Sequence, residues 1–146
     1  MLIRSAIFAD LSAVIALERA APNAAHWSQQ QYEIALGSPE RVFSLAEEDS
    51  RISGLIVARV IAREWEIENI VVAGAKHRRG IGTALLAETV RYAREQKAES
   101  IFLEVRESNV AARSLYQKNG FVLTGRRPHY YQSPKEDALL YRRAVP

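Results

Sequence analysis

Residues 67–83 constrain the fold of this chain more than any other segment. They open on a β-branched run, residues 67–72, which predicts a buried strand. After a short linker, Gly80 and Gly82 stand where an apolar helical pattern begins, directly behind two arginines. Glycines at a helix start let backbone N–H groups approach a ligand closely, and those groups and the helix dipole favour negative charge. The segment therefore predicts a site for a phosphorylated ligand beside a strand whose backbone can also bind it.

Other glycine-rich turns must be weighed against this interpretation. A P-loop requires Lys-Ser or Lys-Thr after its last glycine, whereas Thr83 follows Gly82 directly. A dinucleotide-binding fingerprint requires a third Gly or Ala where Leu85 stands, and its glycines follow the strand without a linker. Neither motif fits. A phosphate site of another kind and a plain solvated basic turn both remain open on these residues alone.

Length and composition set the class of protein. The chain has 146 residues, which suits one domain over residues 1–146, and its 48% hydrophobic and 25% charged residues are ordinary for a soluble globular protein. Arg4, Asp10 and Glu18 interrupt the apolar N-terminal stretch, which fits neither a signal peptide nor a membrane span. We expect a cytoplasmic protein with no membrane partner.

Charge and metal-binding residue types narrow the ligands. The formal net charge is +3, which suits an anionic ligand but is too small and too scattered to predict nucleic-acid binding. Cysteine is absent, which excludes disulfides, thiolate metal sites and a cysteine nucleophile. The three histidines, His26, His77 and His129, lack metal-ligand spacing, so we expect no metal site.

The apolar pattern predicts one strand, two helices and three strands, followed by a helix, a strand, a helix and two strands. Strands are expected at residues 2–4, 41–47, 52–61, 65–72, 100–105, 121–126 and 138–142, and residues 127–136 are expected to form a polar, aromatic loop. This order predicts a mixed α/β sheet with helices on its faces.

Capping residues mark the ends of three expected helices. Asp10 can cap the first helix, and Ser28 with Gln31 makes a capping box for the second, which ends near residue 37. Asn109 can cap the last helix, and Gly120 can close it.

The segment around the glycine pair resembles the cofactor motif of the GNAT family of N-acetyltransferases. That motif is Gln or Arg, two residues, Gly, one residue, then Gly or Ala, and residues 77–82 here run His-Arg-Arg-Gly-Ile-Gly. His77 in place of Gln or Arg is a departure from it. The resemblance implies the GNAT fold, a mixed and mostly antiparallel sheet of about seven strands flanked by about four helices. It also implies acetyl-CoA as co-substrate.

Longer segments resemble the ribosomal-protein-alanine N-acetyltransferase branch of this family. They are residues 103–112 and 115–121, Trp-Ser at 27–28, and the pairs Arg-Arg, Tyr-Tyr and Glu-Asp at 126–127, 130–131 and 136–137. The resemblance covers most of the chain and is strongest from residue 69 to residue 137. Residues 20–65 match poorly apart from Trp-Ser. Because that region helps form the acceptor side in this family, the mismatch leaves the acceptor's identity open.

The resemblance implies roles for individual residues. Glu104 is implied as the general base for the acceptor ammonium, and Tyr116 as the general acid that protonates the departing thiolate. Trp27 and Tyr131 are implied on the peptide side. The residues implied to line acetyl-CoA are Ile70, Val71, Val72, Arg78, Arg79, Gly80, Ile81, Gly82, Thr83 and Asn109. Without cysteine no cysteinyl acyl-enzyme can form, so the transfer is expected to be direct.

Each of these residues also has an ordinary structural explanation. Glu104 fits a half-exposed strand position that faces solvent, Tyr116 an aromatic at the edge of the core, and Asn109 a plain helix cap.

The predicted function is acetyl-CoA-dependent acetylation of the N-terminal α-amine of a protein, with a ribosomal protein among the candidate partners. Acetylation of a small amine, such as a polyamine or an aminoglycoside, or of lysine is the alternative. A non-catalytic acyl-CoA-binding module is the third hypothesis. The presence of both Glu104 and Tyr116 argues against that module, since binding alone needs neither.

Overall fold

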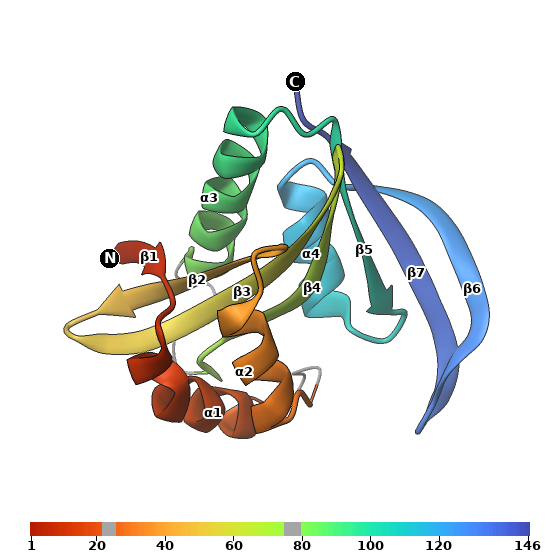
Figure 1. The fold of residues 1–146 in the computed structure, drawn as a ribbon. Helices are drawn as coiled ribbons and strands as arrows, with labels where there is room; N and C mark the ends of the chain where they lie inside the picture. The colour runs from red at the N-terminus through yellow and green to blue at the C-terminus, as the bar shows by residue number, and fades with distance from the viewer. Residues whose placement is uncertain (22–25, 75–79) are drawn as a thin grey trace.

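Seven strands form one sheet in the computed structural model, which describes residues 1–21, 26–74 and 80–146 (Figure 1). The strand order is β1-β2-β3-β4-β5-β7-β6, and neighbours are antiparallel except for the parallel pair β4 and β5. The strands are β1 (Leu2–Ser5), β2 (Arg41–Glu48), β3 (Arg51–Ile61), β4 (Glu64–Val72), β5 (Ser100–Arg106), β6 (Val122–Gln132) and β7 (Lys135–Ala144). The helices are α1 (Leu11–Ala20), α2 (Gln29–Gly37), α3 (Ile81–Glu95) and α4 (Val110–Lys118), with a short 3₁₀ helix, η1 (Phe8–Asp10), before α1. The predicted order of strands and α-helices is confirmed.

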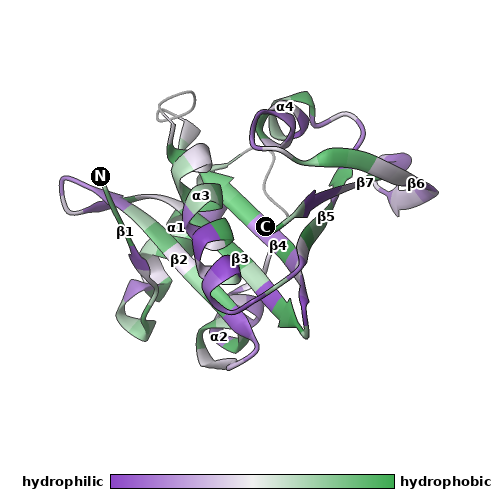
Figure 2. Cartoon of the chain, turned by 90° about the horizontal axis from the view of Figure 1, so that it is seen from above, coloured by the Kyte–Doolittle hydropathy of each residue, from purple (hydrophilic) through white to green (hydrophobic). Residues whose placement is uncertain are grey.

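Each face of the sheet carries an apolar core. Helices α3 and α4 lie on one face and α1 and α2 on the other (Figure 1). Figure 2 shows the apolar strand surface that α3 covers. Buried members of the first core include Trp65, Leu85, Leu86, Ile101, Leu103 and Tyr116; those of the second include Val14, Tyr32, Leu45, Leu55 and Val71. Because β4 contributes to both cores, it is held between helices from the two halves of the chain.

Two of the three predicted helix starts are confirmed. The Ser28 hydroxyl accepts the Gln31 N–H at 3.2 Å, and the Gln31 side chain accepts the Ser28 N–H at 2.8 Å. Asn109 accepts the Ala112 N–H at 3.2 Å. Asp10 makes no such bond to α1. Its carboxylate instead accepts the Ile7 N–H at 2.8 Å, because η1 intervenes and shifts the capping position.

The prediction of a loop at residues 127–136 is wrong. Strands β6 and β7 form a long hairpin whose pairing continues to Gln132 opposite Lys135. Because β6 is an edge strand, its side chains face solvent on both sides, and polar residues are stable there. Pro128 lies in the register shift between Arg127 and Tyr131, where the ladder does not need its missing N–H.

The parallel pairing of β4 with β5 is short. It covers three residue pairs and ends with Glu66 opposite Phe102. Beyond this pair β5 stays paired with β7 and β4 stays paired with β3, so β4 and β5 separate from each other (Figure 1). The pairing of β4 with β3 has a register shift: Val57 of β3 lies opposite Asn69 and the next residue, Ala58, opposite Ile67. The C-terminal ends of β4 and β5 thus lie on adjacent strands but do not pair with each other.

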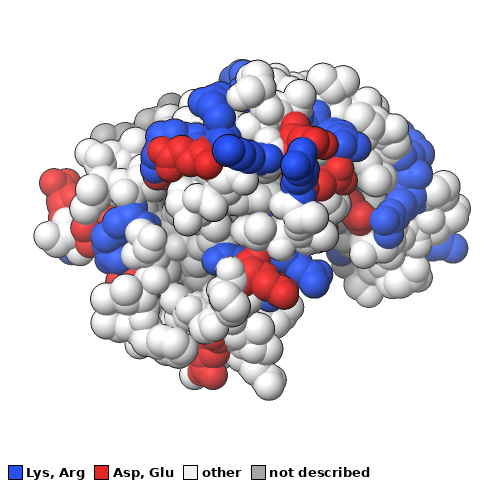
Figure 3. Space-filling model, turned by 45° about the horizontal axis from the view of Figure 1, so that its top comes forward, with Lys and Arg blue, Asp and Glu red and all other residues white. Residues whose placement is uncertain are grey.

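Charged side chains of both signs are interspersed on the face shown in Figure 3. In the view of Figure 3, Lys and Arg side chains stand among Asp and Glu side chains rather than in one basic patch. In the described residues no helix is long and apolar enough to cross a membrane, and no group of three or more His, Cys, Asp or Glu side chains is placed to hold a metal.

Candidate active site

The start of α3 offers backbone donors to a ligand. Gly80 precedes the helix with φ +81°, a left-handed conformation that favours glycine, and its carbonyl accepts the first helical hydrogen bond from Ala84 at 2.9 Å. Gly80 has no side chain with which to cap this end. The N–H groups of Ile81, Gly82 and Thr83 therefore have no partner within the helix. The arginines Arg78 and Arg79, and His77 before them, lie outside the described residues.

Gly82 lets helices α3 and α4 pack closely. A Cβ added at Gly82 would lie 2.9 Å from Leu115 Cδ2, because α3 and α4 approach closely at this point. Asn119, which follows α4, donates to the Thr83 hydroxyl at 3.2 Å and strengthens the same contact. The sequence predicts that Gly82 admits a ligand to the backbone, and the packing against Leu115 is a second reason that sequence reasoning did not find.

Glu104 lies where β5 leaves β4. Its side chain is 16% exposed and pairs with Arg127 of β6 at 3.2 Å, so the explanation of a solvent-facing strand residue is wrong. A second carboxylate, Glu66 of β4, lies nearby: burial raises its pKa, and the charges of Glu68 and Glu104 raise it further. Sequence reasoning missed Glu66 and Arg127. The alternation of Glu64, Glu66 and Glu68 in an otherwise apolar strand was the available signal.

Tyr116 of α4 is a buried phenol. The residue is 5% exposed, with the rings of Phe121 and Tyr141 at centroid distances of 5.8 and 6.4 Å. Its hydroxyl makes no hydrogen bond with any described residue. Burial raises the pKa of Tyr116 well above its ordinary value, and Tyr131 raises it further. Tyr116 is therefore protonated at neutral pH and has a proton to donate.

Tyr131 of β6 connects the two predicted catalytic residues. The Arg106 guanidinium lies over its ring, 4.1 Å from the centroid. Burial raises the pKa of Tyr131, and the charge of Glu104 raises it further. Since Tyr131 also raises the pKa of Tyr116, Tyr131 lies within electrostatic range of both Glu104 and Tyr116.

Trp27 lies on the α1–α2 side of the sheet. Its ring packs against Tyr32 of α2, with centroids 5.2 Å apart, and its backbone N–H donates to Glu18. Its described contacts are with the second apolar core, which also contains Val71 of β4. Its described contacts thus lie on the other face of the sheet from the core that holds Tyr116.

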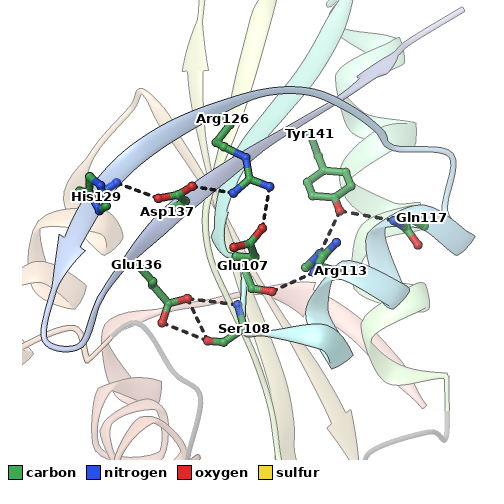
Figure 4. A network of polar contacts seen from close by, with 9 residues as sticks. All are labelled: Glu107, Ser108, Arg113, Gln117, Arg126, His129, Glu136, Asp137 and Tyr141. Carbon is green, nitrogen blue, oxygen red and sulfur yellow. Dashed lines mark hydrogen bonds and ion pairs between the residues drawn. The ribbon is translucent and has the colours of Figure 1, made fainter.

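A polar network holds the segment that leads into α4 (Figure 4). The Glu136 carboxylate accepts the Ser108 N–H at 3.1 Å, and Arg126 bridges Glu107 and Asp137 at 2.6 Å each. Arg126, Glu136 and Asp137, which belong to the Arg-Arg and Glu-Asp pairs of the sequence, thus connect the hairpin to the start of α4. Asn109 is engaged as a cap through Oδ1, as its ordinary explanation requires.

Comparison with known proteins decides the family. The model of the acetyltransferase (GNAT) family matches residues 10–121, most of the chain. The chain belongs to this family. The parting of β4 from β5 and the glycine-led start of α3 are thus features of a GNAT protein.

Similar proteins of this family have named activities. The [ribosomal protein bS18]-alanine N-acetyltransferase of Escherichia coli K12 is 30% identical over 133 residues, which are 90% of this chain and 88% of that protein. The N-alpha-acetyltransferase of Sulfurisphaera tokodaii is 32% identical over 152 residues, covering 94% and 89%. The crystal structure of the ribosomal-protein-S18-alanine N-acetyltransferase from Escherichia coli superposes with a TM-score of 0.88 at 26% identity, covering 99% of this chain and 93% of that one.

The family match and these relatives confirm the prediction of a GNAT-fold N-acetyltransferase, including its seven-stranded, mostly antiparallel sheet. The roles of the individual site residues stay predictions.

Proposed function

We propose that this GNAT protein transfers the acetyl group of acetyl-CoA directly to the N-terminal α-amine of a protein. The observation that carries the proposal is the grouping of a shielded carboxylate, Glu104, with a buried phenol, Tyr116, around Tyr131, next to the point where β4 and β5 part. The names of the relatives support the choice of acceptor, and a ribosomal protein is the partner that they favour.

The residues of β4 and α3 suit acetyl-CoA, which when bound supplies an acetyl thioester. The strand end Ile70, Val71 and Val72 shares no ladder with β5 and would lie along the pantetheine arm. The N–H groups of Ile81, Gly82 and Thr83, with Arg78 and Arg79, would hold the pyrophosphate, because a helix start favours anions. The side-chain amide nitrogen of Asn109 bonds to no described residue and would contact the same arm.

Two proton transfers follow from the side chains. Glu104 accepts a proton from the acceptor ammonium, which leaves a neutral amine able to attack the acetyl carbon. Tyr116 donates its phenolic proton to the thiolate sulfur as it departs, and the second proton that the attacking nitrogen loses as the amide forms restores the phenol. The raised pKa keeps Tyr116 protonated until that moment.

An α-amine suits this arrangement better than lysine. The pKa of an α-amine is about 7.7–8.0 and that of lysine about 10.4, so near neutral pH lysine is harder to deprotonate by roughly 3.4 kcal/mol. A single carboxylate therefore has less free energy to supply for the first amine than for lysine. Tyr131 and Trp27 would enclose the first acceptor residue from two sides.

Turnover with a free N-terminal peptide, measured in variants, tests the proposed roles. We expect Glu104→Gln and Tyr116→Phe each to lower kcat by about 10²–10⁴-fold with little change in acetyl-CoA affinity. The Glu104→Gln loss should shrink at high pH, where the amine deprotonates unaided, whereas the Tyr116→Phe loss should persist. Glu99→Gln and Tyr92→Phe are matched surface controls and should keep wild-type kinetics. Wild-type kcat in Glu104→Gln at neutral pH would refute the assignment of the base.

A further inference from the structure

A buried polar group on the α1–α2 side of the sheet takes no part in the chemistry above. It consists of Glu18 in α1, Tyr32 in α2 and Asn69 in β4, whose exposed fractions are 5%, 0% and 5%. The Tyr32 hydroxyl accepts a hydrogen bond from Asn69 Nδ2 at 2.9 Å. Burying a carboxylate, a phenol and an amide costs free energy, and apolar side chains would fill the same space without that cost. Stability alone therefore does not account for the group.

Glu18 is the most costly member. No Lys or Arg in the described part of the chain pairs with it, and its buried Oε2 makes no hydrogen bond of ordinary geometry there. Its other oxygen, Oε1, accepts the backbone N–H of Trp27 at 2.6 Å, a short charge-assisted bond. The carboxylate thus holds the main chain immediately before α2.

Tyr32 holds the side chain of the same tryptophan. The two rings pack at a centroid distance of 5.2 Å, tilted by 51°. Burial raises the pKa of Tyr32, and the charge of Glu18 raises it further, so the phenolic proton is retained next to the carboxylate. Two contacts therefore hold Trp27: its backbone N–H donates to Glu18, and its ring packs against the ring of Tyr32.

Asn69 connects this group to the thioester strand. It lies next to Ile70 in β4, opposite the register shift of β3. Its side chain reaches Tyr32 on the α1–α2 side, whereas Ile70 packs against the α3 core. A continuous path of contacts runs from Trp27 through Tyr32 to the strand.

We propose that Glu18, Tyr32 and Asn69 are positioning residues that fix Trp27, and with it the acceptor side of the site, against the strand that would hold the thioester. The proposal rests on the proposed function. Reacting atoms must be held within a fraction of an ångström for efficient transfer, so loss of this support affects use of the acceptor before it affects acetyl-CoA.

Tyr32→Phe is the primary test, because it removes the hydroxyl that ties the ring to Asn69 and leaves the ring itself in place. The matched control is Thr89→Val, which removes a buried hydroxyl from α3 that donates to the Leu85 carbonyl at 3.0 Å. We expect Tyr32→Phe to raise the peptide KM by about three- to tenfold, the range of one lost hydrogen bond, with an unchanged acetyl-CoA Kd by calorimetry. Thr89→Val should lower the Tm without changing the peptide KM.

Acrylamide quenching of Trp27 fluorescence tests positioning independently of turnover. The chain has two tryptophans, and Trp65 is 1% exposed, so it contributes a constant background. Quenching should increase in Tyr32→Phe and in Glu18→Gln, and not in Thr89→Val. Glu18→Gln, which keeps an oxygen for the Trp27 N–H and removes the charge, replaces Tyr32→Phe if that variant does not fold.

The outcomes separate the two proposals. Wild-type peptide KM and wild-type quenching in both variants would overturn the positioning role. A wild-type protein that binds acetyl-CoA but acetylates no peptide would overturn the proposed function, and increased quenching in the variants would then still support the positioning of Trp27.

Discussion

The contact between Gly82 and Leu115 predicts that Gly82→Ala changes stability in opposite directions in the wild-type protein and in a Leu115→Ala variant. A methyl group at Gly82 would lie 2.9 Å from Leu115 Cδ2, roughly 0.6–1.1 Å short of the 3.5–4.0 Å at which carbon atoms pack best. Overpacking costs about 1–3 kcal/mol, and replacing a helical glycine by alanine returns about 0.5–1 kcal/mol. We therefore expect Gly82→Ala to lower the free energy of unfolding by up to about 2.5 kcal/mol.

Removing Leu115 removes the clash. In a Leu115→Ala background only the helix-propensity gain remains, so Gly82→Ala should stabilise the protein by about 0.5–1 kcal/mol. The coupling between the two sites is then about 1–3 kcal/mol, measurable by urea denaturation of the four variants of the double-mutant cycle. Acetyl-CoA affinity, measured by calorimetry on the same four proteins, reports separately on how closely a ligand approaches the Gly82 backbone.

Additive stability effects would refute the packing argument. If Gly82→Ala weakened acetyl-CoA binding equally in both backgrounds while stability effects added, the glycine would serve the ligand alone.

Two further predictions concern charge. Hydrogen bonding to Arg4 lowers the pKa of Asp10. The stability from this carboxylate is therefore present above the unfolded pKa of about 3.9 and lost as the pH falls through the lower folded value. Urea denaturation at a series of acidic pH values should show that the free energy of unfolding falls less steeply for Asp10→Asn than for wild type, and equal slopes would contradict this. The double substitution of Arg78 and Arg79 by Gln should weaken acetyl-CoA binding roughly three- to thirtyfold, with a smaller loss at high salt, and a loss independent of salt would argue against phosphate contact.

The sequence predicted what short-range contacts decide. Hydrogen bonds between residues three apart form the capping box of Ser28 and Gln31 and the cap at Asn109. The order of strand, glycine and helix is likewise specified within one continuous segment of the chain. Residues 127–136 were misjudged because an edge strand tolerates the polarity and proline that also mark loops.

The remaining features depend on contacts between distant segments. The pair of Glu104 with Arg127 and the network of Glu18, Tyr32 and Asn69 each join different elements, and no local pattern specifies them. The same holds for the approach of α3 to α4 that gives Gly82 its packing role. The resemblance implies that Glu104, Tyr116 and Tyr131 share one site, and the edge hairpin places Tyr131 within electrostatic range of the other two.

The most direct test of the account offers the protein two peptides of one sequence that contains a lysine. One has a free N-terminus and an acetylated lysine; the other has a blocked N-terminus and a free lysine. With acetyl-CoA at neutral pH, we expect mass spectrometry to find acetylation of the first peptide at a much higher kcat/KM than of the second, in step with the roughly 2.5-unit gap between the pKa values of the two amines. Equal or faster acetylation of the blocked peptide would contradict the account and favour a lysine or small-amine acetyltransferase.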